Sequence, residues 1–254
     1  MCEHCGAFSF AREKIHCCHH GKVRVEPDDD YPGGWKELFD DAEILDGAHH
    51  FNNSCAFASF GAKVDRLPNT GPPCLRIHGQ IYRRIGSLEP RTQGQPRQYG
   101  QIYILDAQEA EQATHHRMQN PVTRSRCNPD RLNWLHQTLA DVNPYARDYR
   151  MMHEVATEEE AKAEAEGTPV KKVRMVFLEK GRQITAQSRR YSRPVERGEV
   201  AAVFATKDGE PLPPHHRDVV VHHQASGSLF VPYYSEHADG LLYPLLFPTR
   251  HSGW

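Results

Sequence analysis

The cysteines and histidines nearest the N-terminus have the types and the spacing of metal ligands. Cys2 and Cys5 are separated by two residues, and the run 16–20, His-Cys-Cys-His-His, brings further thiols and imidazoles. A thiolate pair on one tight turn can take two corners of a zinc tetrahedron, and the later run then supplies the other two. The sequence therefore predicts a small structural zinc knuckle over residues 1–25.

The alternatives for these thiols are a disulfide and plain free cysteines. Disulfide frameworks are typical of secreted chains with an even number of cysteines. This chain has seven cysteines, and its first ten residues lack the basic and apolar regions of a signal peptide. We therefore expect a nuclear or otherwise intracellular protein that is not secreted.

The composition restricts the possible partners only weakly. The 254 residues include 31 Lys and Arg against 33 Asp and Glu, for a formal net charge of −2 at pH 7. Binding of nucleic acid would therefore depend on local basic patches rather than on the charge of the whole chain. The chain has no run of about 18 apolar residues, so we expect no membrane-spanning segment and no membrane partner.

Two basic patches are candidate DNA-binding surfaces. Arg83 and Arg84 end the alternating stretch Leu75–Ile85, which predicts a half-buried strand with a cationic outer face. The second patch places guanidinium groups beside an aromatic ring, a combination suited to phosphate contact and base stacking. Its residues are Arg189, Arg190, Tyr191 and Arg193. The alternative for both patches is pairing with local carboxylates or simple solvation.

The common catalytic templates are missing. The sequence contains no Gly-x-x-x-x-Gly-Lys-Ser/Thr loop, no Gly-x-Ser-x-Gly elbow, no His-Glu-x-x-His and no His-x-His pair. A zinc enzyme with water in the fourth metal position is disfavoured because no general base stands beside the cysteines. We therefore expect no enzymatic activity and no small-molecule substrate.

Several start and stop signals indicate the helices and strands. Asn128-Pro129 and Asn143-Pro144 each combine an N-cap with a proline at the first helical position. A capping box at Thr157–Glu160 predicts a separate Ala/Glu helix that stops at Gly167. A strand over 101–105 is expected to form a hairpin-like unit with the strand over 75–85. Short helices are expected over 35–39 and 199–205, and strands over 173–177 and 217–221.

These elements predict a mixed α+β fold, in which the zinc knuckle precedes a mixed domain with a small antiparallel sheet and helices. We expect an α/β core over 26–156 and an acidic helical spacer over 157–169. A basic β/α segment then follows over 170–254.

The order of the motifs resembles the N-terminal part of Helitron rolling-circle transposases, which are helicase-like proteins. Each motif is weak alone, but nine in the right order are difficult to obtain by chance, and they cover nearly the whole chain. The motifs are Cys2-x-x-Cys5-Gly-Ala, Cys17-Cys18-x-x-Gly-Lys-Val, 56–62, 79–90, 101–104, Asn143-Pro144, 199–202, 217–221 and Tyr-Pro-Leu-Leu-Phe-Pro at 243–248.

The resemblance implies an arrangement of domains. In that family a zinc-finger-like region precedes a rolling-circle nuclease domain and a Pif1-type helicase. The motif at 243–248 would lie just before the nuclease, which implies that the nuclease and helicase motifs lie beyond this chain. Thr249–Ser252 departs from the Gly/Glu/Asp-rich turn that is common at this point in the family.

The resemblance also implies the zinc ligands Cys2, Cys5, Cys17 and Cys18. Residue chemistry leaves the fourth ligand open, because adjacent cysteines fit poorly around one tetrahedral ion. His20 is then the alternative to Cys18, and His16 is a weaker one.

The function implied is non-catalytic recognition of single-stranded DNA or transposon ends in DNA transposition. The alternative is a degenerate or domesticated transposon remnant that serves as a protein-interaction module.

Overall fold

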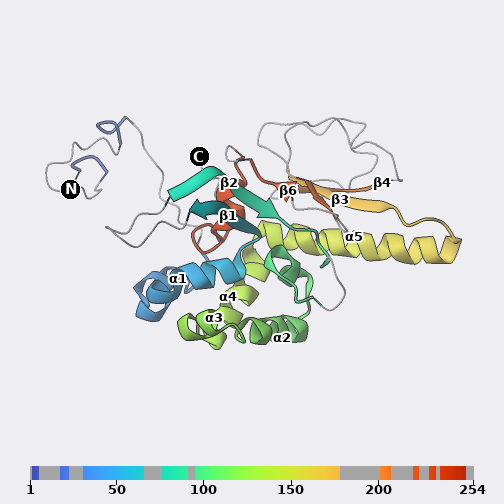
Figure 1. Cartoon of the computed structure of the whole chain (residues 1–254), viewed down its shortest axis with the longest axis horizontal. Helices are drawn as coiled ribbons and strands as arrows, with labels where there is room; N and C mark the ends of the chain where they lie inside the picture. Colours follow the sequence, from blue (N-terminus) through green and yellow to red (C-terminus); the bar gives the residue numbers. More distant parts are fainter. Residues whose placement is uncertain are drawn as a thin grey trace. The chain divides into compact units, whose positions relative to one another are not determined.

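The computed structural model describes residues 2–5, 18–22, 31–65, 76–90, 95–177, 201–206, 220–222, 229–232 and 235–249. The chain divides into two compact units, residues 1–31 and residues 32–254. The second unit combines helices with two small antiparallel sheets (Figure 1). This confirms the predicted α+β class.

The first sheet has the strand order β1-β2-β6. Strand β1 (Ala58–Asp65) pairs antiparallel with β2 (Arg76–Ile85), and β2 pairs antiparallel with the short β6 (Leu229–Phe230). The register of β1 against β2 shifts between Gly61 and Lys63. The strand predicted over 75–85 is therefore confirmed, and its described partners are β1 and β6.

The strand predicted over 101–105 is wrong, because these residues belong to the 3-10 helix η2 (Tyr99–Ile104). The Gln101 side-chain oxygen accepts a hydrogen bond from the Gln98 backbone N–H at 2.9 Å, which closes the turn. Gly100 packs so closely on Tyr149 that an added Cβ would lie 2.5 Å from the ring. Tertiary packing therefore overrides the alternating sequence pattern here.

The second sheet has the strand order β4-β3-β5 and is antiparallel. Strands β3 (Lys172–Phe177) and β5 (Val220–His222) confirm the strands predicted in these regions. Strand β4 (Ala201–Thr206) replaces the helix predicted over 199–205. The alanines of this segment favour a helix locally, but pairing with β3 and packing against helix α5 (Pro144–Glu166) stabilise a strand instead.

The helices begin and end largely where the sequence signals lie. They are η1 (Lys36–Asp40), α1 (Ala42–Cys55), α2 (Ala107–Arg117), α3 (Pro121–Arg126), α4 (Pro129–Val142), α5 (Pro144–Glu166) and α6 (Ala238–Leu242). The Asn128 side chain accepts hydrogen bonds from the first turn of α4, and Asn143 does the same for α5. Both predicted N-caps are thus confirmed. Gly167, with φ of 63°, ends α5 as expected.

The separate helix expected to begin at Thr157 is not formed, because α5 continues through this position without a break. Thr157 Oγ1 donates to the carbonyl of His153 at 3.0 Å, one turn earlier in the same helix. No glycine or proline interrupts positions 145–166, and alanine and glutamate are strong helix formers. The local capping signal is therefore outweighed by propagation of the existing helix.

Aromatic rings form the core of the second unit. Phe57 stacks on Tyr103 with ring centroids 4.5 Å apart, and Tyr145 meets Phe177 edge-on at 5.4 Å. All four side chains are buried. The Tyr145 hydroxyl also hydrogen-bonds the buried His237 ring at 3.0 Å. The start of β1, η2, α5, β3 and the start of α6 are thereby joined in one cluster.

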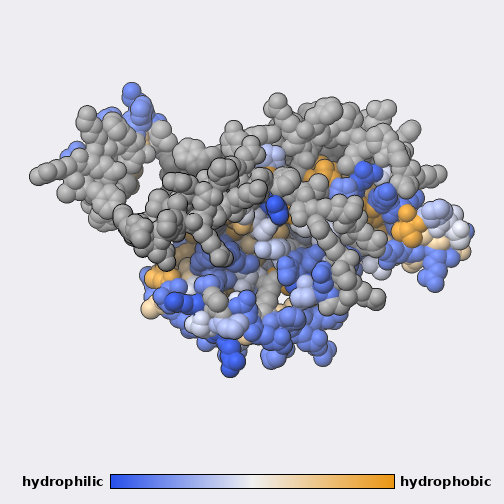
Figure 2. Space-filling view, viewed as in Figure 1, coloured by the Kyte–Doolittle hydropathy of each residue, from blue (hydrophilic) through white to orange (hydrophobic). Residues whose placement is uncertain are grey.

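The apolar segment near residue 245 packs into this unit, as its composition predicts. Leu241, Leu242 and Leu245 are buried, and the Trp35 indole N–H donates to the Leu245 carbonyl at 3.0 Å. Hydrophilic residues gather over α2 and α3 on the face seen in Figure 2. Within the described ranges, no helix has the length and apolarity needed to cross a membrane.

Candidate functional site

Three thiols of the first unit meet in one group. The Sγ atoms of Cys2, Cys5 and Cys18 all lie within 4.8 Å of one another, and those of Cys2 and Cys18 are 3.7 Å apart. Two thiolates on one tetrahedral zinc ion lie about 3.8 Å apart, since each Zn–S bond is about 2.3 Å. The same separation is far too long for a disulfide, and none of the three cysteines forms one. The group has the geometry to hold a metal ion.

Two short turns position these thiols. His19, His20 and Gly21 have φ values of 50°, 57° and 77°, and this turn brings the Gly21 N–H within 3.2 Å of Cys18 Sγ. An N–H donor to a ligand atom is the kind of outer contact that orients metal ligands. A Cβ on Gly21 would lie 3.2 Å from the His4 ring. The turn at 2–5 and the turn at 18–22 therefore pack together at a position that favours glycine.

The electrostatics of the group oppose ionisation of its thiols until a metal ion binds. The Gly21 N–H lowers the pKa of the Cys18 thiol, but desolvation and the neighbouring Cys2 and Cys5 thiols outweigh it and raise that pKa overall. Adjacent thiols resist ionising together because like charges repel. A metal ion reverses this balance, because a coordinating thiol loses its proton to the metal's charge.

The structure thus brings together three of the five predicted ligands. His20 lies in the same turn as Cys18, yet its ring is outside the group of mutually close ligand atoms. The group contains Cys18 itself, rather than His20 in its place. Cys17 and the weaker candidate His16 lie outside the described residues.

The predicted basic patches are only partly described. Arg83 and Arg84 are neighbours in β2, so their side chains leave opposite faces of the sheet. Arg84 is exposed, whereas Arg83 is half-buried and its Nε atom is buried without a hydrogen-bond partner. The two arginines therefore do not form one surface. The second patch, Arg189, Arg190, Tyr191 and Arg193, lies outside the described residues.

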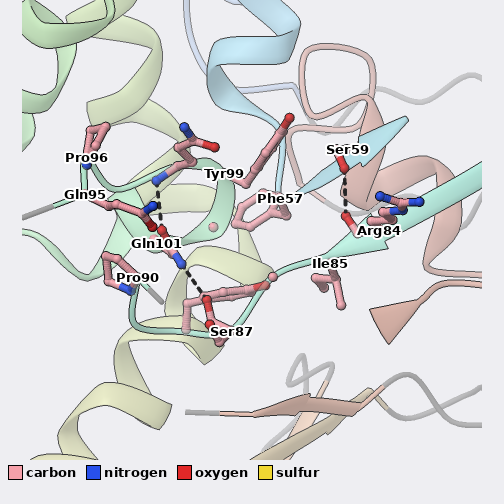
Figure 3. A pocket seen from close by; sticks show the side chains of 14 residues that line it. Phe57, Ser59, Arg84, Ile85, Ser87, Pro90, Gln95, Pro96, Tyr99 and Gln101 are labelled. Carbon is pink, nitrogen blue, oxygen red and sulfur yellow. Dashed lines mark hydrogen bonds between the residues drawn. The ribbon is translucent and has the colours of Figure 1, made fainter. Parts of the chain in front are cut away.

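Arg84 lines a hollow of about 400 Å³ that sequence reasoning missed (Figure 3). The buried rings of Phe57 and Tyr149 form its floor, while Tyr99 and Gln101 belong to the η2 side. The Gln101 amide donates to the Ser87 carbonyl at 2.7 Å, which ties η2 to the end of β2. The residues that line the hollow come from β1, β2, η2, α5 and loops between them. No short sequence motif therefore predicts this hollow.

Comparisons with known proteins do not identify the chain. No protein-family model matches the sequence, and neither the curated proteins nor the solved structures include a significant match.

Proposed function

We propose that this chain is a non-catalytic DNA-binding segment whose N-terminal unit is a structural zinc knuckle. The observation that carries the proposal is the group of Cys2, Cys5 and Cys18, whose three Sγ atoms lie within 4.8 Å of one another. Several thiolates around a small tetrahedral space favour zinc among the common metal ions. Cys17 or His20 completes the tetrahedron, and the metal holds the two turns together without taking part in catalysis.

The DNA-binding part of the proposal is supported by the motif order and by the surface around Arg84. The order of motifs resembles the N-terminal region of Helitron transposases, which work on DNA in the nucleus. Arg84 is exposed on β2 and lines the hollow of Figure 3, where its guanidinium is accessible to a phosphate. In this proposal the chain recognises DNA for a nuclease that lies elsewhere.

Metal analysis tests the knuckle directly. Protein purified under reducing conditions should contain one zinc ion per chain, and Cys18→Ser should lose it. Cys127→Ala is the matched control, because Cys127 is a buried cysteine of the second unit that is not part of the group. Comparing Cys17→Ser with His20→Ala then identifies the fourth ligand. Absence of bound zinc from the folded wild-type chain would overturn this part of the proposal.

A DNA titration tests the function. Fluorescence anisotropy with single-stranded and duplex oligonucleotides, at low and at physiological salt, should show binding that weakens as salt rises. The slope of that dependence reports the number of phosphates contacted. A folded, zinc-loaded sample that binds neither oligonucleotide at low salt would contradict DNA binding and favour a protein-interaction module instead.

A further inference from the structure

Two neighbouring hollows of the second unit share three lining residues, Pro96, Gln98 and Tyr99. One is the hollow of about 400 Å³ described above, and the other measures about 420 Å³. We call the pair the Tyr99 cleft. Each half has a size typical of a pocket for a small ligand, and Pro96, Gln98 and Tyr99 border both halves.

The lining of the Tyr99 cleft is polar and carries no carboxylate. The described residues that line either half include no aspartate or glutamate, although the chain has 33 of these residues. A third hollow of about 810 Å³ gives the contrast, since Asp106, Glu111 and Asp141 line it. Arg150 offsets part of that negative charge, but the lining of the Tyr99 cleft opposes an anion less, because it adds no carboxylate.

Two arginines line the Tyr99 cleft, Arg84 in one half and Arg97 in the other. Arg97 forms an ion pair with Glu89 at 3.0 Å, so part of its charge is balanced there. Arg84 is exposed at the end of β2. Because Arg84 is more exposed than Arg97, we assign the main phosphate contact to Arg84.

The backbone at Tyr99, a residue that lines both halves, is fixed by its neighbours. Tyr99 has φ of 52°, a conformation that residues other than glycine rarely adopt. Gly100 next to it is fixed against Tyr149, and the Gln101 side chain is fixed to the Gln98 N–H and to the Ser87 carbonyl. Backbone strain of this kind persists where surrounding contacts determine it, and it concentrates at binding sites.

The remaining lining groups have the chemistry that recognises a nucleobase. Gln95 (Figure 3) and Gln98 are exposed, so their amides offer hydrogen-bond donors and acceptors to a base edge. The Tyr99 side chain is half-buried, which leaves part of it accessible from the cleft. Stacking on an aromatic side chain requires a base whose face is not covered by its neighbours, a condition that single strands meet and duplexes do not.

We propose that the Tyr99 cleft binds consecutive nucleotides of single-stranded DNA. One base stacks on Tyr99, the exposed amides contact base edges, and Arg84 contacts a phosphate. This inference rests on the proposed DNA-binding function and names the site that performs it.

Removal of the ring is the first test. Tyr99→Asn eliminates stacking but suits the positive φ, because asparagine tolerates this conformation. Affinity of the zinc-loaded full chain for a fluorescein-labelled oligo(dT) strand, measured by anisotropy, should fall about tenfold or more. Tyr99→Phe, which returns a ring to this position, should restore it. Tyr243→Asn is the matched control, because Tyr243 is 39% exposed elsewhere in the same unit.

Two matched substitutions that each add a negative charge test the cleft without changing the Tyr99 ring. Gln98→Glu places a carboxylate in the Tyr99 cleft and should weaken oligo(dT) binding. Gln108→Glu makes the same change of net charge in the third hollow and should have a much smaller effect. Circular dichroism of each variant checks its fold. If both cleft variants bind oligo(dT) as tightly as their controls, the assignment of the Tyr99 cleft is overturned while the DNA-binding function stands.

A measurement with a mononucleotide distinguishes failure of the cleft assignment from failure of the proposed function. If the wild-type chain binds no oligonucleotide, the proposed function fails, and equilibrium dialysis with dTMP then tests the cleft alone. Binding of dTMP that is lost in Tyr99→Asn would support a site for nucleotides, with a free nucleotide as its source. Absence of dTMP binding in that case would overturn the cleft as well.

Discussion

The N-terminal unit is held together by thiols, whereas the second unit is held together by aromatic rings. Among the described residues of the first unit, the buried side chains are those of Cys2 and Cys18. In the second unit Phe57, Tyr103, Tyr145 and other rings pack in one cluster. A unit as small as the first buries too little apolar surface to fold by that means, so a metal is the expected substitute. We therefore expect the first unit to unfold when a thiol or the proposed metal ion is lost, and the second unit to unfold when its aromatic packing is lost.

Loss of a thiol should have the largest effect, and only in the first unit. If the metal is zinc, as proposed, Cys18→Ser or a strong chelator should remove an ion whose apparent binding free energy in small zinc domains is about 10–16 kcal/mol. We expect limited proteolysis to cut within residues 1–31 while a fragment containing the second unit persists. Cys127→Ala should keep both the zinc and the protease resistance. Cleavage of both units at equal rates after chelation would contradict the comparison.

Removal of a ring from the aromatic core should destabilise the second unit and leave the first unit unchanged. Phe57→Ala removes a fully buried ring that contacts Tyr103, Tyr145 and Tyr149, so unfolding of the second unit should become easier by about 3–5 kcal/mol. Urea denaturation followed by fluorescence measures this change, and the zinc content should stay at the wild-type level. Phe60→Ala is the control, because Phe60 lies three residues further along the chain, in β1, and is 52% exposed.

Two glycines sharpen the comparison further. Gly100→Ala should cost the second unit about 1–3 kcal/mol, because the added methyl meets the Tyr149 ring at 2.5 Å. Gly21→Ala should instead weaken zinc binding, since φ of 77° and the His4 ring both oppose a side chain there. Gly33→Ala, with no atom near its Cβ position, should change neither quantity. Thermal denaturation and zinc titration of the three variants test these expectations.

The smallest expected effect is a pH dependence in the second unit. Burial, followed by the charges of Arg174 and Lys172, lowers the pKa of His222 below its ordinary value of about 6.5. The unfolded chain therefore takes up this proton more readily, so stability is present above about pH 6.5 and declines as pH falls. His222→Gln should flatten the dependence between about pH 5 and 7, and exposed His115→Gln should not. Acid also releases zinc from thiolates, so zinc content must be followed in parallel.

Elements with local signals could be predicted from the sequence. Asn128 and Asn143 cap α4 and α5 as their positions indicate, and β2 follows its alternating pattern. The prediction failed at residues 101–105 and 199–205, where distant partners decide the conformation. Tyr149 and Ser87 impose the turn at η2, and pairing with β3 makes a strand of the alanine-rich β4.

The candidate sites divide in the same way. Cys2, Cys5 and Cys18 are close in sequence, so their spacing predicted the group that the structure brings together. The Tyr99 cleft collects residues from the second half of α1 to the start of α5, and its central feature is a backbone conformation. Neither the assembly of residues from distant segments nor the backbone conformation of Tyr99 can be derived from the spacing of residues in the sequence. Arg83 and Arg84 are neighbours in β2 and face opposite ways, so DNA contact by either stays a prediction for two separate surfaces.

The hydrogen bond from Trp35 to the Leu245 carbonyl joins positions 210 residues apart. A ribosome adds about 5–20 residues each second, so roughly 10–40 s separate the synthesis of these two partners. During that interval the Trp35 indole N–H lacks the acceptor that it has in the finished chain. The second unit therefore cannot complete its fold until residue 245 has been synthesised, whereas the three thiols of the proposed metal site are all present once residue 18 has been added.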